Sequence, residues 1–162
     1  YRASFGKNSE RTKLNSKDNV TPSGEYKICR IDSVHKFYKF FQLDYPNEKE
    51  AYESYRRGDI NTDELNAILI SRKNNECTPP ETRLGVPIGI HGIGEYNVIF
   101  KNLPFTFNWT NGSIALSNEG ADELYSVLKI GTLVIISNKK KKKNTILNYF
   151  NLFIQYINLF SE

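Results

Sequence analysis

The stretch Trp109-Thr110-Asn111-Gly112-Ser113-Ile114-Ala115-Leu116 places a nucleophilic hydroxyl directly after a glycine and before an apolar run. A nucleophile on a tight turn needs a small neighbour, which Gly112 supplies. Backbone N–H groups around such a turn are natural donors to an oxyanion. Upstream, residues 84–90 read as a short apolar strand that delivers His91 at its end. This order of segments can bring a histidine base to the Ser113 hydroxyl, which is the pairing that acyl transfer needs.

A serine and a distant histidine are by themselves weak evidence for a catalytic pair, because most such residues in a sequence have no functional relation to each other. Taken alone, His91 also fits a structural histidine at a strand end, and His35 fits an ordinary surface or strand histidine. The remainder of the chain has to separate these interpretations.

Several strands are predicted from turn residues and apolar patterns. Thr21-Pro22-Ser23-Gly24 reads as a turn that precedes a strand over residues 26–31. The aromatic run at residues 37–43 is typical of a partly buried strand, and residues 132–136 are expected to close the sheet.

Residues 47–72 change to a helical period and read as an insertion of two helices between strands. The first helix opens at Pro46-Asn47-Glu48 and stops at Gly58. The second begins at Asn61, which forms a capping-box-like pair with Glu64, and runs to about Arg72. The expected buried stripe of this pair consists of Tyr52, Tyr55, Leu65, Ile68 and Leu69.

One more helix is expected after the Gly-Ser motif. Asn118 is predicted to cap it, and the helix should run to about Lys129 with Gly131 at the C′ position. Strands with a few helices predict an α+β fold that is mainly β, with a sandwich-like sheet.

Composition fits one globular domain with a core of ordinary size. The chain has 162 residues and no methionine, and it opens at Tyr1 on an apparent strand end, so we expect an N-terminal truncation. Of its 22 Lys and Arg residues, five form the run at 139–143, and the other 17 are balanced by 18 Asp and Glu. Because a nucleic-acid binder usually spreads its basic residues over a folded face, that class of function is disfavoured.

Cys29 and Cys77 are the only cysteines. Two cysteines without Cys-x-x-Cys spacing make no metal site. They fit either two buried thiols or, in an exported protein, a disulfide.

The tail at residues 138–162 differs from the rest. After the lysines, polar residues recur every three or four positions along an apolar stretch, which predicts an amphipathic helix. The stretch is too short and interrupted for a membrane span. The helix would pack on the domain or on another copy. Alternatives are a membrane-surface contact through residues 139–162, or a tail of non-native or read-through origin.

The motifs together resemble the YkuD-type L,D-transpeptidases over residues 1–136. Besides the stretch at 109–116, the likeness includes a Thr-Pro-Ser-Gly-Glu-Tyr motif at 21–26 and Leu84-Gly85-Val86-Pro87-Ile88-Gly89-Ile90-His91-Gly92. The signature is similar to the branch that reads Trp-Thr-x-Gly-Cys-Ile-Ala. The order and spacing of these pieces make the likeness specific, and it implies a catalytic domain at residues 1–137.

The resemblance implies peptidoglycan chemistry outside the cytoplasm of a bacterium. Such enzymes form an acyl-enzyme at the bond before the terminal D-Ala of a stem tetrapeptide, and an amine or water then receives the acyl group. His91 matches the base, and Ser113 stands where the family has its cysteine nucleophile. Neither a metal nor an organic cofactor is implied. Oxyanion and substrate contacts are expected from Gly92, Trp109, Thr110, Asn111 and Gly112.

Serine at this position is a chemically serious departure. A thiol has a pKa of about 8.5, whereas a serine hydroxyl is far less acidic and needs a finely placed base. The chain is therefore expected to be an inactive relative or an engineered Cys-to-Ser form. The alternative function is a non-catalytic module of the same fold that binds peptidoglycan or a protein.

Overall fold

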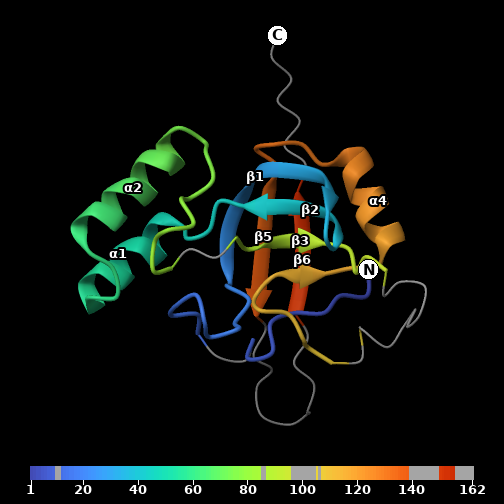
Figure 1. Cartoon of the computed structure of the whole chain (residues 1–162), viewed down its shortest axis with the longest axis horizontal. Helices are drawn as coiled ribbons and strands as arrows, with labels where there is room; N and C mark the ends of the chain where they lie inside the picture. The colour runs from blue at the N-terminus through green and yellow to red at the C-terminus, as the bar shows by residue number, and fades with distance from the viewer. Residues whose placement is uncertain (10–11, 85–86, 96–104, 106, 139–149, 156–162) are drawn as a thin grey trace.

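A six-stranded sheet organises the protein in the computed structural model, which describes residues 1–9, 12–84, 87–95, 105, 107–138 and 150–155 (Figure 1). The strand order is β4-β3-β2-β1-β5-β6. The strands are β1 (Gly24–His35), β2 (Tyr38–Leu43), β3 (Gly89–His91), β4 (Ile114–Ala115), β5 (Leu133–Asn138) and β6 (Phe150–Gln155). The helices are α1 (Glu48–Arg57), α2 (Thr62–Lys73) and α4 (Asn118–Val127). The predicted α+β class is confirmed.

The long strand β1 belongs to both halves of the sheet. Its first residues, Gly24 to Lys27, pair with β5, and its later residues, from Ile28 to His35, pair with β2. Figure 1 shows β2 and β3 crossing in front of β5, so the sheet curls into two layers. One core cluster lies between them and includes Tyr26, Phe41, Ile90, Ile114 and Val134. Burial of this shared face gives the sandwich-like arrangement.

The helical insertion forms as predicted. Asn47 and Glu50 make a complete capping box at α1, and Asn61 and Glu64 make one at α2. Gly58 ends α1 in the left-handed conformation, with a φ of 78°. Each cap satisfies backbone N–H groups that a helix otherwise leaves without partners.

The predicted buried stripe of the insertion is only partly correct. Leu65 and Ile68 are buried and Leu69 packs against them, whereas Tyr52 and Tyr55 are 48% and 42% exposed. The small residues Ala51 and Ser54 face inward instead. Small side chains let two helices approach closely, so the bulky tyrosines stay at the rim.

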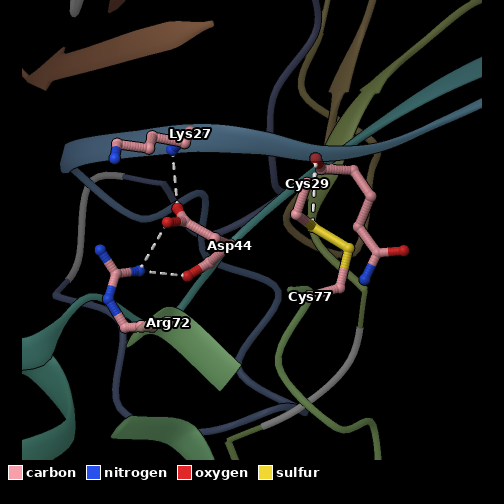
Figure 2. The surroundings of a disulfide bond; sticks show 6 residues. Lys27, Cys29, Asp44, Arg72 and Cys77 are labelled. Carbon is pink, nitrogen blue, oxygen red and sulfur yellow. Dashed lines mark hydrogen bonds and ion pairs between the residues drawn. A yellow bond between two sulfur atoms is a disulfide. The ribbon is translucent and has the colours of Figure 1, made fainter. Parts of the chain in front are cut away.

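Three contacts fasten the insertion to the sheet. Cys29 of β1 and Cys77, which follows α2, form a disulfide, so of the two alternatives for the cysteines the disulfide is the one observed (Figure 2). Arg72 makes an ion pair with Asp44 (3.0 Å), whose carboxylate also accepts from the Lys27 backbone N–H (2.7 Å). The Tyr26 hydroxyl donates to Glu50 of the α1 capping box (2.7 Å).

The boundaries of α4 differ from the prediction. Ser117, not Asn118, is the N-cap, because its side chain accepts from the Gly120 N–H (3.1 Å). The helix ends at Val127, and the Gly131 N–H donates to the Ile28 carbonyl (2.7 Å) in the turn before β5. Asn118 and Gly131 therefore serve tertiary contacts rather than the helix ends.

The predicted helix in the tail is wrong where the structure describes it. Residues 150–155 form β6, which pairs antiparallel with the whole of β5. The edge of β5 offers unpaired backbone groups, and a strand satisfies them while a helix would not. The expectations for residues 139–149 and 156–162, including the lysine run and a membrane-surface contact, lie outside the described residues. None of the helices in the described part of the chain has the length and apolar character that a membrane crossing requires.

Candidate functional site

Parallel pairing of β3 with β4 brings the two sequence motifs together. Ile90 pairs with Ile114, and His91 pairs with Ala115. Both isoleucines are fully buried in the core. Side chains alternate between the faces of a strand, so His91 lies on the face opposite Ile90, and Ser113 precedes Ile114 by one residue. The sheet register thus places histidine and serine on the same side, with the Ile90–Ile114 pair between them.

The His91 ring is held by the neighbouring backbone carbonyl. Its Nδ1 lies 2.6 Å from the carbonyl oxygen of Gly92. A carbonyl oxygen only accepts hydrogen bonds, so Nδ1 carries the proton and donates it. The neutral ring then has its lone pair on Nε2. This tautomer makes Nε2 the proton acceptor that a base requires.

The space around residue 92 is too small for any side chain, so this position requires glycine. A Cβ there would lie 2.7 Å from Asn118 Oδ1 and 3.0 Å from the Phe37 carbonyl oxygen. Asn118 Oδ1 accepts from the N–H groups of Ile93 and Gly94, at 3.0 Å each. Asn118 therefore fixes the loop whose first carbonyl orients His91. The sequence predicts Asn118 as a helix cap, and only the fold shows that its side chain holds this loop instead.

Aromatic rings bury His91. The ring stacks on Phe37 with centroids 4.8 Å apart, and Phe40 and Trp109 lie with centroids at 6.2 Å. Only 3% of the histidine surface is exposed. Burial disfavours the charged imidazolium and lowers the pKa of His91 to about 4, although the Gly92 carbonyl acts in the opposite direction. His91 is therefore neutral at pH 7, which is the form that can accept a proton.

The lowered pKa of His91 predicts a loss of stability in mild acid. Its folded pKa of about 4 lies below the ordinary histidine value of 6.5, so the unfolded chain binds the proton first as the pH falls. This stability is complete above pH 6.5, decreases as the pH falls towards 4, and then levels off. The loss amounts to about 3 kcal/mol. Urea unfolding of the parent and of His91→Gln at pH 7, 5.5 and 4 measures it.

The difference between the two unfolding free energies cancels the contribution of the carboxylates, which both proteins share. We expect that difference to change by about 3 kcal/mol between pH 7 and pH 4. His35→Gln removes a more exposed histidine and should give a smaller change. A constant difference between parent and His91→Gln would contradict the burial argument.

The turn before β4 is closed by Thr110. Its hydroxyl donates to the Ser113 carbonyl oxygen (2.5 Å) and accepts from the Gly112 N–H (3.2 Å). Gly112 has a φ of 128°, and a Cβ there would lie 2.8 Å from the Val20 carbonyl oxygen. Both findings require glycine before the nucleophile position. The Gly112 N–H is thus engaged in the turn.

The Ser113 hydroxyl oxygen accepts from the backbone N–H of Gly89 at 3.2 Å. Glycine is again required, because a Cβ at Gly89 would lie 2.4 Å from the Phe41 carbonyl oxygen. A backbone donor at this distance stabilises negative charge on the atom that it contacts. The residue 113 side chain therefore lies in an environment that favours an anion.

A pocket of about 650 Å³ gathers most of the predicted site. Ser113, His91, Trp109, Thr110 and Asn111 all line it, while Gly112 and Gly92 shape its backbone. Sequence reasoning missed a second set of lining residues from the β1–β2 hairpin and from the loop before Val20, which consists of Ser16, Lys17, Asn19, Arg30, His35, Lys36, Phe37 and Phe40. Their approach is decided by the curl of the sheet, so no local pattern could have identified them.

Among the described residues, no group of three or more His, Cys, Asp or Glu side chains could hold a metal ion. Proton transfer and hydrogen bonding are the chemistry that the lining groups themselves offer.

The YkuD family model, which describes the L,D-transpeptidase catalytic domain, matches residues 1–136. The chain belongs to this family. The match spans every described strand except β6 and ends inside β5, and it includes both the His91 and the Ser113 segments of this L,D-transpeptidase domain.

Among solved structures, this chain is similar to one titled "Structure of Bdellovibrio bacteriovorus Bd1075", with 20% identity and a TM-score of 0.42. The similarity covers 81% of this chain and 35% of that one, so this chain spans about a third of its length. None of the curated proteins matches the chain.

Proposed function

We propose that this domain is a peptidoglycan L,D-transpeptidase site in which residue 113 is the nucleophile and His91 is the base. The observation that carries the proposal is the His91 Nδ1 contact with the Gly92 carbonyl (2.6 Å), in a pocket that Ser113 also lines. It gives a neutral histidine with a free acceptor nitrogen beside a nucleophile position. Family membership supplies the substrate class, peptidoglycan stem peptides.

The proposed reaction has two steps. The side chain of residue 113 attacks the carbonyl carbon before the terminal D-Ala, and His91 Nε2 takes its proton. The C–N bond then breaks, and His91 returns the proton to the leaving amine, which releases D-Ala and leaves an acyl-enzyme. An amine of another stem, or water, attacks the acyl group and regenerates the side chain. The Gly89 N–H is placed to stabilise charge on the attacking atom.

A serine at residue 113 should make the first step slow. Its hydroxyl is far less acidic than a thiol, and a base with a pKa of about 4 is a weak proton acceptor for it. This observation favours the second candidate, a non-catalytic module that binds peptidoglycan or a protein in the same pocket. Under either function we place the domain outside the cytoplasm, and the Cys29–Cys77 disulfide supports an oxidising compartment.

Acylation by a carbapenem, followed by intact-protein mass, tests the enzyme proposal. We expect no adduct on the Ser113 protein and a stoichiometric adduct on Ser113→Cys, because a thiol reacts where the hydroxyl does not. The matched control is Ser117→Cys, which places a thiol at the N-cap of α4, away from the pocket lining. If folded Ser113→Cys forms no adduct while stem tetrapeptide still binds, the non-catalytic module is the correct function.

A further inference from the structure

Among the described residues, the lining of the pocket around His91 and Ser113 includes three basic residues and no acidic one. Lys17 comes from the loop before Val20, and Arg30 and Lys36 come from the β1–β2 hairpin. No described carboxylate makes an ion pair with any of the three. Since the chain outside the lysine run carries nearly equal numbers of acidic and basic residues, this one-sided lining is a local feature.

The hairpin holds Lys36 close to the histidine base. His35 pairs directly with Tyr38, so Lys36 and Phe37 are the two residues of a tight turn. The Lys36 ammonium lies 4.9 Å from the centre of the Phe37 ring, and that ring stacks on His91 at 4.8 Å. A cation above an aromatic face is held electrostatically. The Phe37 ring therefore contacts both a positive charge and the base.

The loop that carries Lys17 also contains an acidic residue, Asp18, whose carboxylate is bonded within the loop itself. The Asp18 carboxylate accepts from the Lys13 ammonium (2.8 Å) and from the backbone N–H groups of Leu14 and Val20 (2.7 and 3.0 Å). Asp18 does not line the pocket. Its charge is therefore offset inside the loop, while Lys17 lines the pocket without a carboxylate partner among the described residues.

His35 adds a neutral hydrogen-bond donor to the same side of the pocket. Its Nδ1 accepts from the Phe37 N–H (3.3 Å), so in the neutral ring the proton is on Nε2. Burial lowers the pKa of His35, with Arg30 and Lys36 acting in the same direction and Asp32 opposing them. The ring stacks on Phe40, with centroids 4.8 Å apart. This side of the pocket thus combines three cations with one N–H donor.

We propose that this wall, made of Lys17, Arg30, His35 and Lys36, binds a carboxylate of the peptide next to the bond that is cleaved. The carboxylate is the free C-terminus of the last residue, because in a tetrapeptide that group lies one residue beyond the scissile carbonyl. The proposal rests on the proposed function. It makes the pocket selective for peptides that end at this residue over peptides that are blocked or extended there.

Binding of stem tetrapeptide to the Ser113 protein tests the proposal without turnover. Calorimetric titration compares three peptides: one with all carboxylates free, one ending in a C-terminal carboxamide, and one with only its inner carboxylates amidated. Loss of a charge-assisted contact corresponds to roughly tenfold weaker binding. We expect that loss for the C-terminal carboxamide and little change for the inner amides. A loss confined to the inner amides, or equal binding of all three, would overturn the proposal.

The protein side of the contact is tested with Arg30→Gln/Lys36→Gln, its fold checked by circular dichroism. It should bind the free peptide roughly tenfold more weakly but bind the carboxamide as the parent does. Lys49→Gln removes an exposed charge on α1 and should change neither affinity. If the double variant folds and keeps the parent's preference for a free C-terminus, the wall does not carry the selectivity.

Turnover by Ser113→Cys separates this proposal from the proposed function. If that variant releases the last residue equally fast from free and amidated peptides, the carboxylate site is wrong and the enzyme stands. If it releases nothing although the free C-terminus still strengthens binding tenfold, the enzyme proposal fails and the carboxylate site stands.

Discussion

In the Ser113→Cys protein, His91→Gln is expected to slow acylation by a carbapenem by about 10²–10⁴-fold at pH 7. The histidine accepts the proton of the attacking thiol through Nε2, and its Nδ1–H contact with Gly92 keeps the ring in that tautomer. Glutamine has similar length and can donate to the same carbonyl, but it cannot accept a proton at this pH. Time-resolved intact-protein mass gives the acylation rate of both proteins.

The pH dependence of that rate separates a base from a structural role. Because a thiol ionises without help above a pKa of about 8.5, the defect of His91→Gln should shrink as the pH rises from 7 to 10. A packing defect would persist at every pH. An acylation rate within threefold of the histidine protein at pH 7, with the variant folded, would show that His91 is not the base.

Replacing both cysteines, as Cys29→Ser/Cys77→Ser, is expected to lower the free energy of unfolding by about 4 kcal/mol. The bond closes a loop of 48 residues that contains β2, α1 and α2. Without it, the unfolded chain gains the freedom of that loop, whereas the folded protein keeps the Asp44–Arg72 ion pair. Guanidinium unfolding of the variant and of the parent, with and without a reductant, gives the two free energies.

The reduced parent is the matched control for the serine substitutions, and it should unfold at nearly the same midpoint as the variant. Neither cysteine lines the pocket at His91, so binding of stem tetrapeptide by folded variant should stay close to that of the parent. A loss below 1 kcal/mol would mean that the unfolded chain is already constrained in this loop. Loss of peptide binding in folded variant would show that the helical insertion acts on the pocket.

Local sequence patterns predicted the structure correctly where a residue satisfies a requirement of the neighbouring backbone. Asn47 and Asn61 cap their helices in sequence patterns that need no tertiary information, and Gly58 stops α1 for the same reason. Asn118 and Gly131 carried similar local signals, and both were misassigned. Their backbone and side-chain groups instead contact the loop after His91 and the strand β1. An asparagine or glycine pattern does not reveal whether the partner is local or distant.

Predictions from hydrophobic periodicity were wrong for the tail helix and for the burial of the tyrosines of α1. The polar spacing of residues 144–162 suits a helix, yet residues 150–155 pair with β5 because that edge was open. A hydrophobic pattern states which residues seek burial but not which surface is available to bury them. In α1 the available space favoured Ala51 over Tyr52.

The sequence by itself determined the family, the α+β class, and the positions of His91 and Ser113, because motif order and glycine spacing record backbone requirements directly. The tertiary structure decided the disulfide, the tautomer of His91 and the composition of the pocket wall. Curling of the sheet around β1 brings Lys17, Arg30 and Lys36 towards a strand pair more than 50 residues away in the chain. Contacts between such distant segments depend on packing of the whole core, and no local pattern specifies them.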